Sequence, residues 1–266
     1  MALKFCANLT FMFTESGSLL ERYNLARLAG FHGVESAFPK GFSIEDLLTA
    51  KQSLTQVLIN IRTGTVSGGE FGLAAVCGDS KGLNYQDAFR EDLHTTVEYA
   101  KALQCKRIHI MAGKVTEVTD DNHKVYVENL KYAVKILEKE NIVGLIEPIN
   151  RYAVPGYYLN CYDRAVEVIK EVNSPNLRLM LDMFHLQHIR GNITNSVKDL
   201  LPYVGHVQIA QVPHRNEPNT PGEIDYNYVL RMLAEEGYND WVGCEYHPKT
   251  FTNDGLGWIK EFGLNF

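Results

Sequence analysis

The stretch DYNYVLRMLAEEGYNDWVGCEY, residues 225–246, contains one helix followed directly by one strand. Asp225 precedes a run of apolar residues with helical spacing, and aspartate favours the N-cap of a helix. Gly237 follows that run, as glycine commonly does where a helix ends. The apolar segment 241–246 comes next and has the composition of a buried strand. The stretch therefore predicts one helix–strand unit of an α/β protein.

The same alternation recurs along the whole chain, which favours parallel strands joined by crossover helices. We expect eight strands, at residues 3–9, 33–38, 56–61, 107–112, 143–150, 177–183, 206–212 and 241–246. We expect helices near residues 18–29, 43–53, 85–103, 121–140, 161–172, 194–201, 225–236 and 254–262. No linker interrupts the pattern, so it predicts a single catalytic domain over residues 1–266, an α/β fold of the (β/α)8 TIM barrel type. An open doubly wound sheet is the alternative, because periodicity does not give the strand order.

Composition narrows the classes of function. A formal net charge of −6 argues against a nucleic-acid partner, because neutralising phosphates needs an excess of Lys and Arg. The five cysteines form no CxxC pair, so neither a disulfide framework nor a thiolate zinc site is indicated. No apolar run has the length of a membrane span. These features predict a cytoplasmic protein without a membrane partner.

Two expected loops are longer than a connection needs. Residues 62–84, which include Glu70 in a glycine-rich part, follow the third strand, and residues 213–224 follow the seventh. Long loops on the carboxyl side of barrel strands are commonly binding loops or lids. The glycine-rich part lacks the GxxxxGK[ST] pattern of a phosphate loop. We therefore expect a flexible lid there.

Polar residues stand near the carboxyl ends of four successive predicted strands. They are Glu147, Asp182, Gln208 and Glu245. Adjacent strands of a barrel lie about 4.8 Å apart, so side chains at equal heights can converge on one cation. Carboxylate and amide oxygens suit Mg²⁺, with Mn²⁺ or Co²⁺ as alternatives. The competing interpretation is that these are ordinary strand-end groups held by a neighbouring Lys, Arg or backbone N–H.

Two further polar residues follow the predicted sixth and seventh strands. His185 and Arg215 could together bind an oxyanion or hydroxyl of a small substrate. For His185 the alternative is a histidine hydrogen-bonded within a loop. His206 opens the predicted seventh strand, away from the carboxyl end, and we assign it no role.

Five motifs resemble the hydroxypyruvate isomerase family of the xylose-isomerase-like TIM barrel superfamily. They are IEPIN at Glu147, LDMFH at Asp182, GHVQIA at Gln208, VPHRNEPNTPGEIDY around Arg215, and WVGCEY at Glu245. The resemblance covers essentially the whole chain, including Asn8 in the first predicted strand and GEFGLAA after the third. One departure is Gln211, where the family pattern is closer to aspartate, and this puts any role of a carboxylate there in doubt.

The resemblance implies an isomerase that interconverts hydroxypyruvate and 2-hydroxy-3-oxopropanoate (tartronate semialdehyde). It implies that Glu147 and Glu245 are the acid–base pair and also approach the metal, with Asp182 and Gln208 completing the metal coordination. His185, Arg215 and Glu70 match substrate-binding positions. The partner is then a small hydroxycarbonyl compound of glyoxylate and carbohydrate metabolism, and a homo-oligomer is compatible with the sequence.

Other functions on the same barrel are the alternatives. A ketose 3-epimerase or inosose dehydratase would use the same acidic set, but such enzymes commonly place histidine where Gln208 stands. An abasic-site nuclease needs many histidines and a basic face, and this chain has nine histidines and a net negative charge. A non-catalytic sugar-binding barrel would not require the complete acidic set.

Overall fold

The eight strands found in the computed structural model, which describes residues 3–78 and 84–265, run parallel in a closed barrel ordered β1 to β8. This confirms the predicted TIM barrel and excludes the open doubly wound sheet. The bounds are β1 Lys4–Asn8, β2 Gly33–Ser36, β3 Thr55–Asn60, β4 Arg107–His109, β5 Val143–Ile146, β6 Leu177–Asp182, β7 Val204–Ile209 and β8 Trp241–Cys244.

The helices match the predicted ranges closely, with two exceptions. The α-helices are α1 Leu19–Leu28, α2 Ile44–Lys51, α3 Tyr85–Ala102, α4 Asp120–Glu140, α5 Tyr162–Val172, α6 Met183–Ile189, α7 Ile193–Leu200, α8 Tyr226–Glu235, α9 Thr252–Gly255 and α10 Trp258–Glu261, and a 3-10 helix covers Leu201–Tyr203. The helix expected at residues 254–262 is two short helices, because Gly255 and Gly257 stand where it would continue and glycine disfavours a helix interior. None of the helices in the described part of the chain is long and apolar enough to span a membrane.

The second exception is helix α6, which is absent from the predicted helices. The alternative interpretation of His185 placed this histidine in a loop. Asp182 ends β6 and also caps α6, because its side chain accepts a hydrogen bond from the Phe184 backbone N–H at 2.8 Å. Strand and helix therefore adjoin without a connecting loop. His185 lies in the first turn of this helix and is buried.

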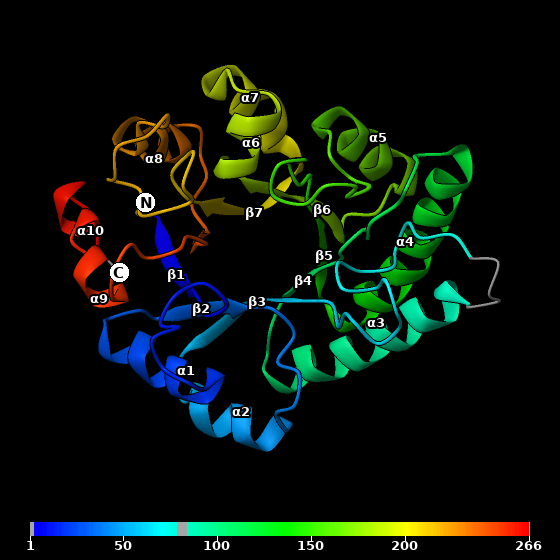
Figure 1. Ribbon diagram of the computed structural model, residues 1–266, viewed down its shortest axis with the longest axis horizontal. Coiled ribbons are helices and arrows are strands. Elements are labelled where there is room, and N and C mark those ends of the chain that lie inside the picture. The colour runs from blue at the N-terminus through cyan, green and yellow to red at the C-terminus, as the bar shows by residue number, and fades with distance from the viewer. Residues whose placement is uncertain (1–2, 79–83, 266) are drawn as a thin grey trace. The chain divides into compact units, whose positions relative to one another are not determined.

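The chain divides into two compact units, and unit 1 comprises residues 1–57 and 181–266. In unit 1, β1 pairs with β2 on one side and with β8 on the other, and β8 pairs with β7. Helices α1 and α2 lie side by side outside β1 and β2 (Figure 1). In β8, a Cβ at Gly243 would overlap the Glu35 carboxylate, so glycine leaves the room that this buried side chain needs.

Unit 2 comprises residues 58–180. Its strand β4 pairs with β3 and with β5, and Leu58, Leu145 and Met180 form a buried cluster. Helices α3 and α4 pack side by side (Figure 1). Of the predicted lid at residues 62–84, residues 79–83 lie outside the described residues, so lid motion stays a prediction.

Candidate functional site

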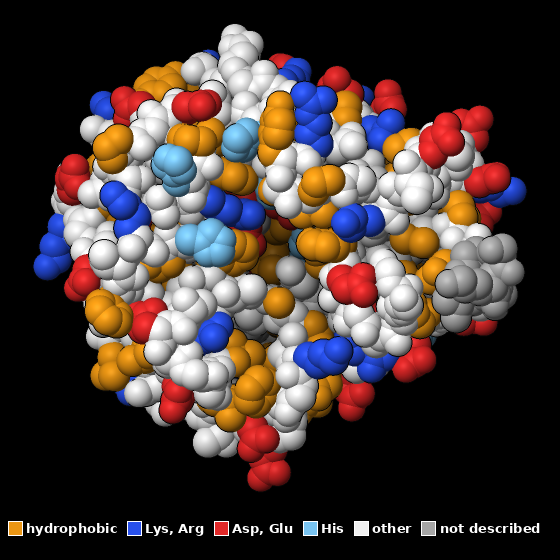
Figure 2. All heavy atoms as spheres, viewed as in Figure 1, with side chains coloured by type: hydrophobic (Ala, Val, Ile, Leu, Met, Phe, Trp, Pro, Cys, Tyr) orange, Lys and Arg blue, Asp and Glu red, His pale blue; other side chains and the backbone are white. Residues whose placement is uncertain are grey.

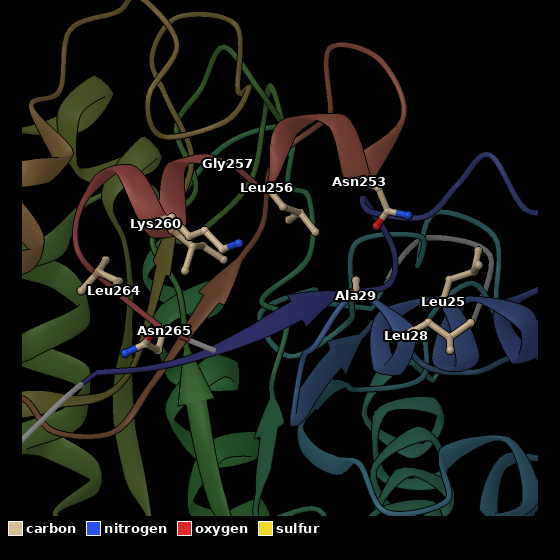
Figure 3. Close-up of a pocket in the computed structure, with 10 residues that line it drawn as sticks. Leu25, Leu28, Ala29, Asn253, Leu256, Gly257, Lys260, Leu264 and Asn265 are labelled. Carbon is tan, nitrogen blue, oxygen red and sulfur yellow. The ribbon is translucent and has the colours of Figure 1, made fainter.

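A groove of about 520 Å³ in unit 1 is mainly apolar and is separate from the predicted site residues (Figure 3). It lies between α1 and the short helices α9 and α10. The residues that line it are Leu25, Leu28, Ala29, Asn253, Leu256, Gly257, Ile259, Lys260, Leu264 and Asn265. It holds no carboxylate for acid–base chemistry, so we locate the candidate site at the polar strand ends instead.

Three of the predicted residues meet in unit 1. Asp182 is the last residue of β6, Glu245 directly follows β8, and Arg215 lies in the loop after β7. Arg215 Nη2 donates to Asp182 Oδ2 at 3.1 Å and also to Glu245 Oε2. Histidine and Lys or Arg side chains gather on the face over α6 and α8 (Figure 2). Two carboxylates thus converge on one positive charge.

Aromatic rings hold the Arg215 guanidinium in place. Its central carbon lies 4.8 Å from the ring centroid of Phe11 and 4.8 Å from that of Phe184. The Arg215 backbone has a left-handed conformation, with φ of 56°, and its N–H donates to the Gln211 carbonyl at 2.7 Å. A side chain fixed by two cation–π contacts and two ion pairs is well ordered for recognition of an anion.

Burial has the largest effect on the pKa values of Glu245 and Asp182. Burial raises the pKa of Glu245 to about 8; Arg215 opposes this change, while Asp182 and Glu35 add to it. Burial also raises the pKa of Asp182, again against the effect of Arg215. A carboxyl group that titrates near neutral pH can both accept and donate a proton, which is what general acid–base catalysis requires.

Gln208 belongs to a hydrogen-bond network centred on Glu35, a residue that the sequence reasoning missed. Gln208 Nε2 donates to Glu35 Oε1 at 2.7 Å, and Asn8 Nδ2 donates to the same oxygen at 2.9 Å. Asn8 Nδ2 also contacts Glu245 Oε1 at 3.1 Å. Burial acts to raise the pKa of Glu35, but His206, Gln208 and Asn8 outweigh it and the pKa is lowered. The network therefore surrounds a buried negative charge.

His206 has a contact in this network, although the sequence reasoning gave it no role. The strand β7 begins at Val204, so His206 lies inside it, fully buried, and its Nε2 is 2.6 Å from Glu35 Oε2. The available signal was Glu35 itself, because a carboxylate inside the predicted strand 33–38 must have buried partners. Sequence spacing could not identify those partners.

The amide and carboxylate oxygens at these strand ends are of the type that divalent cations bind. Gln208 Oε1 is buried and has no hydrogen-bond partner among the described residues, while the Gln208 amide N–H group is satisfied by Glu35. A buried amide oxygen without a partner is costly unless a ligand satisfies it. Asp182 and Glu245 add carboxylate oxygens that already face a cationic group. This donor set suits Mg²⁺ or Mn²⁺.

His185 lies next to Asp182 in unit 1. Its Nε2 is 3.6 Å from Asp182 Oδ2, and its ring packs against Phe184 with centroids 5.3 Å apart. The histidine is buried. His185 is therefore held at the same carboxylate that Arg215 contacts.

Unit 2 holds the remaining predicted residues, Glu147 and Glu70. Glu147 directly follows β5 and is buried, and its Oε2 lies 3.6 Å from His109 Nε2. Burial raises the pKa of Tyr157, and Glu147 contributes to this change. Glu70 lies in a turn of the loop after β3 and is exposed. Within unit 2, Glu147 is thus a strand-end carboxylate in a buried polar setting.

Gln211, the departure from the family pattern, anchors the long loop after β7. Its Nε2 donates to the carbonyls of Pro218 and Ile224 at 3.2 and 2.9 Å, and its Oε1 accepts from the Val212 and Ile224 N–H groups. An amide supplies both donors and acceptors, whereas a carboxylate supplies acceptors alone. Gln211 therefore fixes the loop that carries Arg215.

Comparisons with known proteins agree with this architecture. A family model described as xylose isomerase-like TIM barrel matches residues 23–262. A putative hydroxypyruvate isomerase of Mus musculus is 45% identical, covering 98% of this chain and 95% of that protein. The hydroxypyruvate isomerase of Escherichia coli is 38% identical, covering 98% of this chain and 99% of that protein. A crystal structure of an AP endonuclease, family 2, from Brucella melitensis is 38% identical with a TM-score of 0.89, covering 97% of this chain and 98% of that one. The chain therefore belongs to the hydroxypyruvate isomerase family of xylose isomerase-like TIM barrels.

Proposed function

We propose that this protein interconverts hydroxypyruvate and 2-hydroxy-3-oxopropanoate. One observation carries the proposal: the Asp182 and Glu245 carboxyl groups converge on the Arg215 guanidinium, and desolvation raises the pKa of the part-buried Glu245 to about 8. Such a group can transfer protons at neutral pH. Hydroxypyruvate isomerases among its full-length relatives supply the substrate class.

The reaction moves a carbonyl group between neighbouring carbons. A proton leaves C3 of hydroxypyruvate, an enediolate forms, and a proton arrives at C2, while the hydrogen on oxygen moves from the C3 oxygen to the C2 oxygen. We assign the two carbon-bound proton transfers to Glu245 and Glu147, with roles that reverse with the direction of reaction. Glu147 stands directly after β5 as Glu245 stands directly after β8.

Asp182, Gln208, Glu245 and Glu147 are the proposed cation ligands. A divalent cation, when bound, would supply Lewis-acid stabilisation for negative charge on the substrate oxygens. Mg²⁺ is the cation that we expect, with Mn²⁺ or Co²⁺ as alternatives. The unpartnered Gln208 Oε1 supports this assignment.

Arg215 and His185 are the proposed substrate contacts, with Glu70 from the loop after β3. The substrate carries a carboxylate, and a planar guanidinium binds carboxylates through paired hydrogen bonds. The cation–π contacts to Phe11 and Phe184 keep that group oriented. The single catalytic domain, the cytoplasmic location and the place in glyoxylate metabolism stay predictions from the sequence.

The direct test is an assay of the purified protein with hydroxypyruvate, followed by NMR, before and after chelation and Mg²⁺ readdition. We expect formation of 2-hydroxy-3-oxopropanoate, loss of turnover on chelation and recovery with Mg²⁺. A free ketohexose offered in parallel tests the epimerase alternative. Faster turnover of the ketohexose than of hydroxypyruvate would contradict the proposal.

A further inference from the structure

Glu35 contacts hydrogen-bond partners from two strands of unit 1, β1 and β7. On Oε1 it accepts from Asn8 of β1 and Gln208 of β7, and on Oε2 it contacts His206 of β7 and Cys6 of β1. Glu35 itself lies in β2 and is fully buried. Because its carboxylate is an acceptor on both oxygens, every group facing it must present a hydrogen.

This requirement decides which way round the Gln208 amide lies. An amide has an oxygen end and an N–H end, and the two ends differ little in shape. Glu35 Oε1 accepts a hydrogen bond from Gln208 Nε2 at 2.7 Å, so the other end of the Gln208 amide must be the oxygen. That oxygen, Gln208 Oε1, is the buried atom without a hydrogen-bond partner among the residues described. In the reverse orientation two oxygens would face each other and an N–H group would face the cation site.

We propose that Glu35 is a positioning residue that fixes the amide of Gln208 so that its oxygen, and not its N–H group, faces a divalent cation. The inference rests on the cation site of the proposed function, and it assigns to Glu35 no contact with substrate. Residues that orient metal ligands in this way typically change metal affinity about 10- to 100-fold when they are replaced.

Asn8 connects the Glu35 network to Glu245 through hydrogen bonds. Its Nδ2 donates to Glu35 Oε1 at 2.9 Å and to Glu245 Oε1 at 3.1 Å, so the two N–H bonds of one amide serve the two carboxyl groups. Its Oδ1 accepts from the Thr10 backbone N–H at 3.0 Å, which keeps the Asn8 amide from reversing. Within residues 3–78 and 84–265, the Gln208 oxygen has no second contact of this kind, so the orientation of this amide depends on Glu35.

A double-mutant cycle with Mn²⁺ as the probe tests the proposal by calorimetry on the metal-free protein. Glu35→Met keeps the approximate size of the side chain and removes both acceptor oxygens, and we expect Mn²⁺ affinity to fall about 10- to 100-fold. Gln208→Glu places at position 208 a carboxylate, whose two oxygens are equivalent and need no orientation. In that background, Glu35→Met should cost less than about 3-fold in Mn²⁺ affinity or should increase it. The double variant also has the formal charge of the natural chain.

An equal loss of Mn²⁺ affinity in both backgrounds would overturn the inference, because a role of Glu35 in general packing predicts that result. Absence of Mn²⁺ binding to the natural protein would also overturn it. If Glu35→Met does not fold, a crystal structure of the natural protein with Mn²⁺ decides: Gln208 should contact the ion through Oε1 and Glu35 through Nε2. Gln208 turned away from either partner would contradict the inference. Turnover of hydroxypyruvate is measured separately, so an inactive protein with the expected cycle would refute the proposed activity and leave the role of Glu35 standing.

Discussion

Arg215 Nη2 donates a hydrogen bond to Glu245 Oε2, so a guanidinium lies against a carboxyl group whose pKa is nevertheless raised to about 8. Burial raises the pKa of Glu245 more than the nearby positive charge lowers it, and the neighbouring Asp182 carboxyl group raises it further. The guanidinium also donates to Asp182 and contacts two phenylalanine rings, those of Phe11 and Phe184. This pairing places the proposed proton-transfer group, Glu245, beside the proposed anion-binding group, Arg215.

The raised pKa of Glu245 predicts a pH dependence of stability in the metal-free protein. Between pH 4.5, the ordinary pKa, and about pH 8, the folded state keeps a proton that the unfolded state releases. The contribution of Glu245 to the free energy of unfolding therefore falls as pH rises through this window. Urea denaturation from pH 5 to pH 8 measures it, and Glu245→Gln should flatten the slope. An unchanged slope in that variant would show that Glu245 titrates at its ordinary pKa.

Replacing either proposed acid–base residue should remove most of the activity and leave the fold intact. Glu245→Gln and Glu147→Gln should each lower kcat for hydroxypyruvate by about 10²- to 10⁴-fold, because the amide cannot transfer a proton. Circular dichroism should show an unchanged fold. Glu171→Gln, at an exposed carboxylate beside His123, is the matched control and should keep the natural rate. Near-normal turnover by either active-site variant would remove that residue from the mechanism.

Arg215→Lys tests whether the planar guanidinium matters beyond its charge. Lysine cannot reproduce the contacts to Asp182 and Glu245, and hydrogen bonds of charged groups contribute about 1.5–3 kcal/mol. We expect kcat/KM for hydroxypyruvate to fall about 10- to 100-fold. Arg90→Lys is the control, since Arg90 also lies over an aromatic ring and beside a carboxylate, but on the surface helix α3. Equal effects of the two substitutions would argue against a specific role.

Gln211→Glu tests the anchor of the loop after β7. The substitution keeps the size but loses the two N–H donors and directs an oxygen at the Pro218 and Ile224 carbonyls. Each buried group left unsatisfied costs about 1–3 kcal/mol, so the free energy of unfolding should fall by at least that amount. Gln86→Glu, in the first turn of α3, should change stability little. A Gln211→Glu protein as stable as the natural one would show that the loop does not need this anchor.

The strands were predictable because their signal is local. Apolar runs bounded by capped helices gave β1 to β8 within a few residues, as at Lys4–Asn8 and Leu177–Asp182. Helix α6 was missed because Asp182 serves as both the last strand residue and the helix cap, so no turn separates the two elements. Local patterns identify an element best where a distinct break precedes it.

The site was predictable only in part. Asp182, Gln208 and Glu245 stood out because each is polar at the end of an apolar strand. The proposed role of Glu35 depends on its contact with Gln208, 173 positions away in the chain, and no spacing rule connects them. The contact between Arg215 and Asp182 likewise depends on a left-handed backbone residue in a long loop. Such contacts follow from tertiary packing, which one sequence does not display.

The most direct test of proton transfer through Glu245 is the isomerisation of hydroxypyruvate in D₂O, followed by NMR against an enzyme-free control. The natural protein should form 2-hydroxy-3-oxopropanoate with deuterium at C2, because the proton on a carboxyl group exchanges with solvent, and Glu245→Gln should form almost none. Product formed at the full rate without deuterium, or by Glu245→Gln as fast as by the natural protein, would contradict the account.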